Sequence, residues 1–132
     1  MLVDTNVLSE LPRPRPNGNV VAWFGAQETI HVSVVTLEEL AFGIARASPA
    51  ARSRLGRWLD AFLDAKPIVL DVTAPIARAS GELRAAREAR GRRVAQADML
   101  IAATALTHGL TLATRNGRDF EGCGVSVVDP FE

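Results

Sequence analysis

The sequence contains few of the residues that mark secreted or membrane-spanning proteins. Its single cysteine, Cys123, has no partner for an internal disulfide bond, so nothing indicates an oxidising compartment. The longest stretch without a charged residue is the 16 residues 99–114, fewer than the roughly 18–20 apolar residues of a membrane span. The N-terminal residues lack the basic and apolar regions of a signal peptide. These absences predict a cytoplasmic protein that does not enter a membrane.

Neither sign of charge is in excess, because 15 basic residues balance 15 acidic ones. The balance excludes the overall basicity of many nucleic-acid-binding proteins but leaves room for a local basic patch. Lysine is nearly absent, since 14 of the basic residues are arginine. Arginine binds phosphate and carboxylate groups with a planar fork, although the base composition of a genome explains the same bias equally well. With 48% hydrophobic and 23% charged residues, extended disorder is excluded.

The 132 residues predict one domain, 1–132, large enough to bury about two thirds of its unfolded surface without a disulfide or a structural metal. Short apolar segments alternate with helical patterns along the chain. Strands are expected at 1–3, 30–35, 67–70, 110–113 and 125–128, and helices at 6–10, 20–26, 36–47, 49–65, 73–91 and 97–107. The third helix has a capping-box pattern, with Thr36 as N-cap and Glu39 three residues later. Short strands separated by helices predict a parallel sheet covered by helices on both faces.

Four acidic residues stand where strands end or helices begin: Asp4, Glu39, Asp98 and Asp119. Asp4 directly follows the first strand, and Asp119 follows the fourth strand. Glu39 lies in the first turn of the helix after the second strand, and Asp98 begins the helix that leads into the fourth strand. Because ligands bind at the carboxyl ends of parallel strands, we expect the four side chains to meet at that edge of the sheet.

Helix or turn capping explains each of these acids singly, but it does not explain why four should converge. Two carboxylates about 4 Å apart repel each other by roughly 4 kcal/mol at an effective dielectric constant of 20. A cluster of four must therefore shift its pKa values or bind a cation. Oxygen ligands without a neighbouring histidine or cysteine suit Mg²⁺ or Mn²⁺ rather than Zn²⁺. Such a site is typical of phosphodiester hydrolysis.

Four segments of the chain resemble PIN-domain nucleases, in particular the VapC/FitB-type toxins of type II toxin–antitoxin modules. These segments are Leu2–Glu10, Thr36–Gly43, Ala97–Ala103 and Thr114–Phe120. They occur in the family's order and spacing and cover nearly the whole chain. The resemblance implies a single PIN domain over 1–132, folded as a three-layer α/β/α sandwich around a short, mainly parallel sheet. It also implies Mg²⁺- or Mn²⁺-dependent endoribonuclease activity, a homodimer and a cognate antitoxin.

The resemblance assigns roles to individual residues. Asp4, Glu39 and Asp98 match the three central catalytic and metal-binding acids, and Asp119 matches the fourth, which varies more within the family. The polar residues expected to support them are Thr5, Asn6, Thr114 and Asn116. Glu38 is the neighbour of Glu39, but the family's acid directly precedes leucine and lies four residues before glycine, which selects Glu39. Because water is the nucleophile, the expected RNA products carry 5′-phosphate and 3′-hydroxyl ends.

Residues outside the acidic cluster allow two interpretations each. Five arginines crowd the region before Asp98, and they suit either RNA phosphates or a solvated helix end with an Arg84–Glu88 pair. They are Arg84, Arg87, Arg90, Arg92 and Arg93, of which the last two are the predicted RNA contacts. The aromatic residues Trp23, Phe24, Trp58 and Phe62 suit either the core or a groove for an antitoxin helix. His31 is expected to be structural, and Cys123 to be incidental.

Two other functions compete with the nuclease. An aspartyl phosphatase would use Asp4 as nucleophile, but such enzymes need a second acid two residues later, and position 6 is asparagine. A non-catalytic PIN-fold module that only binds RNA or a protein is the main alternative, although all four acids are present. The RNA target, the number of metal ions and the identity of the antitoxin are left open.

Overall fold

The computed structural model describes all residues from 1 to 132 and contains one sheet of five parallel strands in the order β3-β2-β1-β4-β5. The strands are β1 (Leu2–Val3), β2 (His31–Ser33), β3 (Ile68–Leu70), β4 (Leu112–Ala113) and β5 (Val127–Val128). Each is shorter than the sequence pattern predicted, but all five lie within the expected segments. The parallel α/β architecture is therefore confirmed, and β1 takes the central position.

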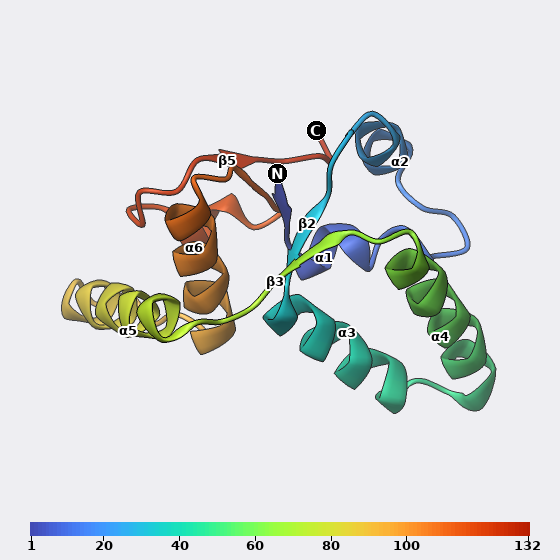
Figure 1. Ribbon diagram of the computed structural model, residues 1–132, viewed down its shortest axis with the longest axis horizontal. Helices are drawn as coiled ribbons and strands as arrows, with labels where there is room; N and C mark the ends of the chain where they lie inside the picture. Colours follow the sequence, from blue (N-terminus) through green and yellow to red (C-terminus); the bar gives the residue numbers. More distant parts are fainter.

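Helices cover both faces of the sheet, as Figure 1 shows, with α5 and α6 on one side and α1, α3 and α4 on the other. The helices are α1 (Thr5–Leu8), α2 (Gly18–Gly25), α3 (Val34–Arg46), α4 (Pro49–Asp64), α5 (Ala74–Ala89) and α6 (Gln96–His108), with a 3₁₀ turn η1 (Gly117–Phe120). Helix α5 packs on α6, and α3 packs on α4. This arrangement confirms the three-layer sandwich. None of the helices combines the length and hydropathy needed to cross a bilayer.

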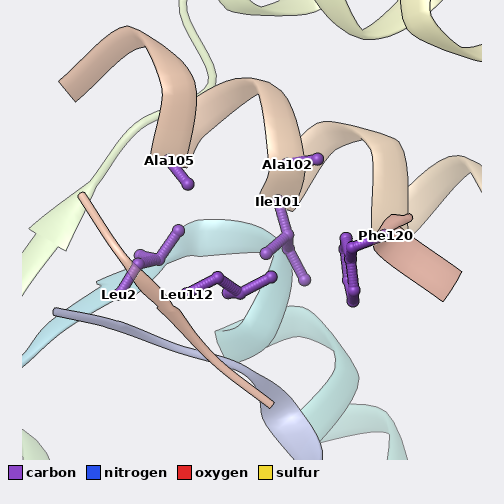
Figure 2. Close-up of a cluster of buried hydrophobic side chains, with 6 residues drawn as sticks. All are labelled: Leu2, Ile101, Ala102, Ala105, Leu112 and Phe120. Carbon is purple, nitrogen blue, oxygen red and sulfur yellow. The ribbon is translucent and has the colours of Figure 1, made fainter. Parts of the chain in front are cut away.

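The two residues of β1 point to opposite faces of the sheet and build two hydrophobic cores. Leu2 packs beside Leu112 of β4, beneath Ile101 and the small side chains of α6 (Figure 2). Phe120 of η1 closes the end of this cluster. Val3 faces the second core, whose buried members are Val3, Val7, Leu8, Val20, Val32 and Leu40. Asp4, the residue after β1, therefore follows a strand that is packed on both faces of the sheet.

The predicted start of the third helix is wrong. Helix α3 begins at Val34, and the Ser33 hydroxyl caps it by accepting the Val35 N–H at 3.1 Å. Thr36 lies inside the helix and is fully buried, so it forms no capping box with Glu39. The β-branched run 30–35 suggested a longer strand, but a polar residue within that run can cap a helix and end the strand there. Glu39 therefore lies in the second helical turn and is free for another role.

Candidate active site

The Asp4 carboxylate lies at the carboxyl end of the central strand and is 5% exposed. Its backbone N–H donates to the Ala113 carbonyl at 2.9 Å, which continues the pairing of β1 with β4. The Oδ1 atom accepts the Thr5 N–H at 2.8 Å and so caps α1, while Oδ2 accepts the Thr114 hydroxyl at 2.8 Å. The Asp4 side chain therefore both caps α1 and forms part of the candidate site.

Thr114 connects the ends of β1 and β4 through its hydroxyl. Besides donating to Asp4, Oγ1 accepts the Asn6 side-chain amide at 3.3 Å and the Asn116 N–H at 3.1 Å. The side-chain oxygen Oδ1 of Asn6 in turn accepts the Arg115 N–H at 3.1 Å. Three of the four predicted supporting residues thus bond through side chains, whereas Asn116 contributes its backbone amide. The network fixes the orientation of Asp4.

Glu39 reaches the same edge from α3. Its Oε1 accepts the Thr5 hydroxyl at 2.7 Å, and the Thr36 hydroxyl lies 3.2 Å from that of Thr5. Thr5 therefore links the acid of α3 to the backbone turn that follows β1. Glu38 is exposed and makes no hydrogen bond or salt bridge, so the two adjacent glutamates occupy different environments. Thr36, expected only as a cap, proves to be a buried neighbour of the acids.

Asp98 and Asp119 complete the group from the opposite side. Asp98 stands in the first turn of α6, and Asp119 lies in η1, the next element after β4. Burial raises the pKa of Asp98 to about 6, and the negative charges of Asp4, Asp119 and Glu39 add to the shift. No basic side chain opposes that shift. The end of β1, the helices α3 and α6 and the 3₁₀ turn η1 therefore bring four carboxylates into electrostatic contact.

The pKa of the Asp4 carboxyl is also raised, but hydrogen bonds to this side chain offset part of the increase. Burial raises its pKa, hydrogen bonds from Thr114 and Thr5 lower it, and the charges of Glu39 and Asp119 raise it again. Hydrogen bonds that stabilise the ionised form keep this acid ready to ionise despite its burial. The four acids therefore form a negatively charged edge of the sheet, and no basic side chain lies among them to neutralise their charge.

These residues suit a hard divalent cation by their chemistry. All four donors are carboxylates, and a cation would relieve the repulsion that, after burial, contributes to the raised pKa of Asp98. As they stand, no three acidic, histidine or cysteine side chains are grouped closely enough to hold a metal ion. A bound cation would offset the repulsion between these carboxylates.

An apolar groove adjoins the acids, which the sequence analysis did not predict at this position. A hollow of about 230 Å³ extends from Thr5 and Glu39 to Trp58, between α1, α3 and α4. A second hollow of about 590 Å³ continues beyond Trp58 towards β3 and is lined by Leu11, Phe24, Ile30, Trp58, Phe62 and Ile68 among others. The sequence signals for the first hollow were the helical spacing of Leu55 and Trp58 on α4 and that of Leu40 and Ile44 on α3.

Packing against the core is confirmed for the four aromatic residues, and three of them also line the larger hollow. Trp23, Phe24, Trp58 and Phe62 are half-buried and pack on the core around Val3. Trp58 also stacks on Phe62, with ring centroids 5.8 Å apart. Three of the four line the larger hollow, Trp23 being the exception. These side chains stabilise the fold and leave an apolar face open to solvent.

The arginines before Asp98 do not form one continuous patch. Arg84 pairs with Glu88 at 3.9 Å, as the helical spacing predicted. Arg87 is buried against Gly122, and Arg92 contacts Glu121 and the Arg118 carbonyl. Arg93 is exposed and forms no salt bridge. Only part of the predicted RNA-binding cluster is therefore free to bind a ligand.

Comparison with known proteins shows which family the chain belongs to. Residues 1–123 match the model of the PIN domain. The chain is 38% identical to the VapC ribonuclease Y4jK of Sinorhizobium fredii, covering 100% of this chain and 98% of the relative. Among solved structures, FitAcB from Neisseria gonorrhoeae superposes with a TM-score of 0.89 at 36% identity, over 99% of this chain and 98% of that one.

A toxin–antitoxin complex from Klebsiella pneumoniae also matches, with a TM-score of 0.74 and 28% identity over 99% of this chain and 98% of that chain. The family match covers far more than half of the chain, and the relatives align over almost their full lengths. These findings agree with the parallel sheet and with the resemblance to VapC and FitB noted in the sequence. The chain belongs to the PIN-domain family.

Proposed function

We propose that this protein is a metal-dependent endoribonuclease toxin that a cognate antitoxin neutralises. The observation that carries the proposal is that Asp4, Glu39, Asp98 and Asp119 lie near enough to interact electrostatically: burial and the other three charges raise the pKa of Asp98 to about 6. The VapC ribonuclease and the toxin–antitoxin complex among its relatives support the same activity and the same kind of partner.

Asp4, Glu39, Asp98 and Asp119 would hold Mg²⁺ or Mn²⁺. When bound, the cation stabilises negative charge on phosphoryl oxygens and lowers the pKa of water. Thr114 and Thr5 donate hydrogen bonds to Asp4 and Glu39, respectively, which orients these carboxylates. Asn6 orients Thr114 in turn. The chain's own contribution is thus a rigid, negatively charged edge at the end of the sheet.

RNA contact is proposed for the basic residues near this edge. Arg93 carries the clearest case, because it is exposed and its guanidinium has no acidic partner. Arg92 remains a predicted RNA contact, although its side chain already engages the η1 turn. Removing an arginine that binds one RNA phosphate should lower the salt dependence of RNA binding by about one unit of slope or less.

The antitoxin is proposed to dock in the apolar groove that leads from Trp58 to β3. The groove is lined by aromatic and aliphatic side chains and shares Trp58 with the hollow beside Glu39, so an amphipathic helix bound across Trp58 would reach the acids. We also propose that the protein is a homodimer, which light scattering on the purified protein tests directly. A monomer at all concentrations would contradict that part of the proposal.

The experiment that tests the activity is RNA cleavage by chelator-stripped protein with Mg²⁺ or Mn²⁺ added back. Glu39→Gln should lose at least about 100-fold in rate, since even residues that only support a metal ligand commonly contribute about 10–100-fold. Glu38→Gln is the matched control, because it removes a neighbouring acid on the exposed side of α3. The products should carry 5′-phosphate ends, and 2′,3′-cyclic phosphate ends would contradict the mechanism.

The non-catalytic alternative makes a different prediction for the same samples. A binding module would bind total cellular RNA equally well as wild type and as Asp98→Asn, and neither protein would cleave it with any metal. A single metal-dependent cut by the wild type alone would exclude that alternative.

A further inference from the structure

The η1 turn, which carries Asp119, is held in place by contacts that have no part in the proposed function. The Asp119 side chain is exposed and forms no hydrogen bond or salt bridge, so its position depends entirely on the backbone of Gly117–Phe120. That backbone is fixed from inside by Phe120, which is 2% exposed in the core beneath α6. From outside, one side chain holds it: Arg92 donates from Nη2 to the Arg118 carbonyl at 3.0 Å.

The same guanidinium reaches the far end of the turn. Arg92 Nη1 lies 3.6 Å from Glu121 Oε2, so the two nitrogen atoms contact the residues on either side of the Asp119–Phe120 pair. The Arg118 carbonyl also accepts the Glu121 N–H at 3.4 Å, which closes the turn. A planar fork that bridges two oxygen atoms holds a segment more rigidly than a single ammonium group does.

Arg92 belongs to the connection between α5 and α6, six residues before Asp98. It therefore ties the turn that carries one acid to the segment that leads into another. Arg87 braces the same region sterically: its Nη1 lies 2.8 Å from the place where a Cβ of Gly122 would stand. Arg87 Nε and Nη2 are buried without hydrogen-bond partners, so it does not share the polar anchoring.

We propose that Arg92 is a positioning residue that holds the η1 turn and thereby sets the place of Asp119 relative to Asp98. This inference rests on the proposed function, and it gives Arg92 a role distinct from contact with RNA. Arg93, the neighbouring arginine, is exposed and makes no comparable contact. It therefore provides a matched control for charge and sequence position.

The test measures Mn²⁺ binding by the protein without RNA, using electron paramagnetic resonance of free Mn²⁺. Arg92→Ala should raise the Mn²⁺ dissociation constant about two- to ten-fold, the range expected when one hydrogen bond is removed, whereas Arg93→Ala should leave it unchanged. In an Asp119→Asn background Arg92→Ala should have no further effect, because the residue acts through Asp119. An unchanged dissociation constant in Arg92→Ala, or equal effects in both backgrounds, overturns the proposal.

Two further measurements separate this role from its alternatives. Arg92→Lys keeps the charge but not the fork, so it should retain the salt dependence of RNA binding while its Mn²⁺ affinity stays reduced; wild-type behaviour in both would favour a simple phosphate contact. Amide hydrogen exchange at Glu121 needs neither metal nor RNA and should be faster in Arg92→Ala than in Arg93→Ala. If the wild type binds no Mn²⁺, the proposed function fails, and unchanged exchange at Glu121 would independently refute the anchoring by Arg92.

Discussion

At the scale of single residues, each acid of the site is shaped by groups that differ from those of its neighbours. Asp4 is deeply buried but receives hydrogen bonds from Thr5 and Thr114, which favour its ionised form. The pKa of Asp98 is raised by burial and by the other acids without a compensating cation. The unfavourable interactions therefore concentrate on Asp98, which makes it the residue most sensitive to neutralisation.

Asp98→Asn should stabilise the metal-free protein at neutral pH. A folded pKa of about 6 against an unfolded value of 3.8 means that the folded state binds the proton more tightly. Stability from this group is thus present below about pH 4 and is lost as the pH rises to about 6 and beyond. Two pKa units correspond to at most about 3 kcal/mol, which solvent screening and removal of the favourable helix-terminus interaction reduce to about 1–2 kcal/mol.

Denaturant unfolding of the chelator-treated protein at pH 4 and pH 8 checks this prediction. The variant and the wild type should differ little at pH 4, and the variant should be the more stable at pH 8. Glu38→Gln serves as the control, since that carboxylate is exposed. A less stable Asp98→Asn protein at pH 8 would show that the charges around Asp98 are already balanced.

At the scale of secondary-structure elements, the boundaries of the strands and helices decide which side chains reach the site. Helix α3 starts two positions before Thr36, so that residue and Glu39 stand one turn apart on the face towards Thr5. Sequence patterns placed the start later because a capping box and a β-branched run both suggested it. In the structure the buried Ser33 hydroxyl supplies the cap instead.

Ser33→Ala should lower the free energy of unfolding by about 1 kcal/mol, because the Val35 N–H loses its acceptor at a partly buried site. Ser48→Ala removes the hydroxyl that caps α4 at the surface and should cost less, since water replaces that acceptor. Denaturant unfolding of both variants measures the difference. Equal stability of Ser33→Ala and the wild type would argue against a helix start at Val34.

At the scale of the whole molecule, the parallel order β3-β2-β1-β4-β5 places every strand's carboxyl end at one edge. The central position of β1 puts Asp4 between Glu39 on one side and Asp98 and Asp119 on the other. The same topology leaves β3 at the edge of the sheet, where Ile68 is 45% exposed and lines the apolar groove. The groove and the acids are therefore consequences of one arrangement.

Ile68→Glu should weaken binding of the cognate antitoxin at least about ten-fold, because it places a charge in the apolar groove without a partner. RNA cleavage should be unaffected, since Ile68 lies outside the acidic site. Val69→Glu is the matched control: it is the next residue of β3, is 38% exposed and does not line the groove. Titration of the antitoxin against each variant measures both affinities. An equal drop in affinity in both variants would contradict docking in this groove.

Much of the fold and of the site could be predicted because it depends on local patterns. Apolar segments of strand length and helix-capping residues identified all five strands and six helices, and the parallel sheet followed from their alternation. Strand lengths were overestimated, because β-branched residues favour extended structure in Val34 and Val35 even though both belong to α3. The order of the strands and the groove beside Trp58 depend on packing between distant segments, which no local pattern contains.

The sequence by itself determined which chemical groups are available: four carboxylates at strand ends and helix starts, four polar neighbours and a balanced charge. Only the tertiary structure decided how they act together. Burial raises the pKa of Asp98, the Thr114 hydroxyl orients Asp4 across 110 residues, and Arg92 holds the turn of Asp119. The physical reason is that desolvation, charge repulsion and hydrogen bonding depend on distance in space, which the position of residues along the chain does not fix.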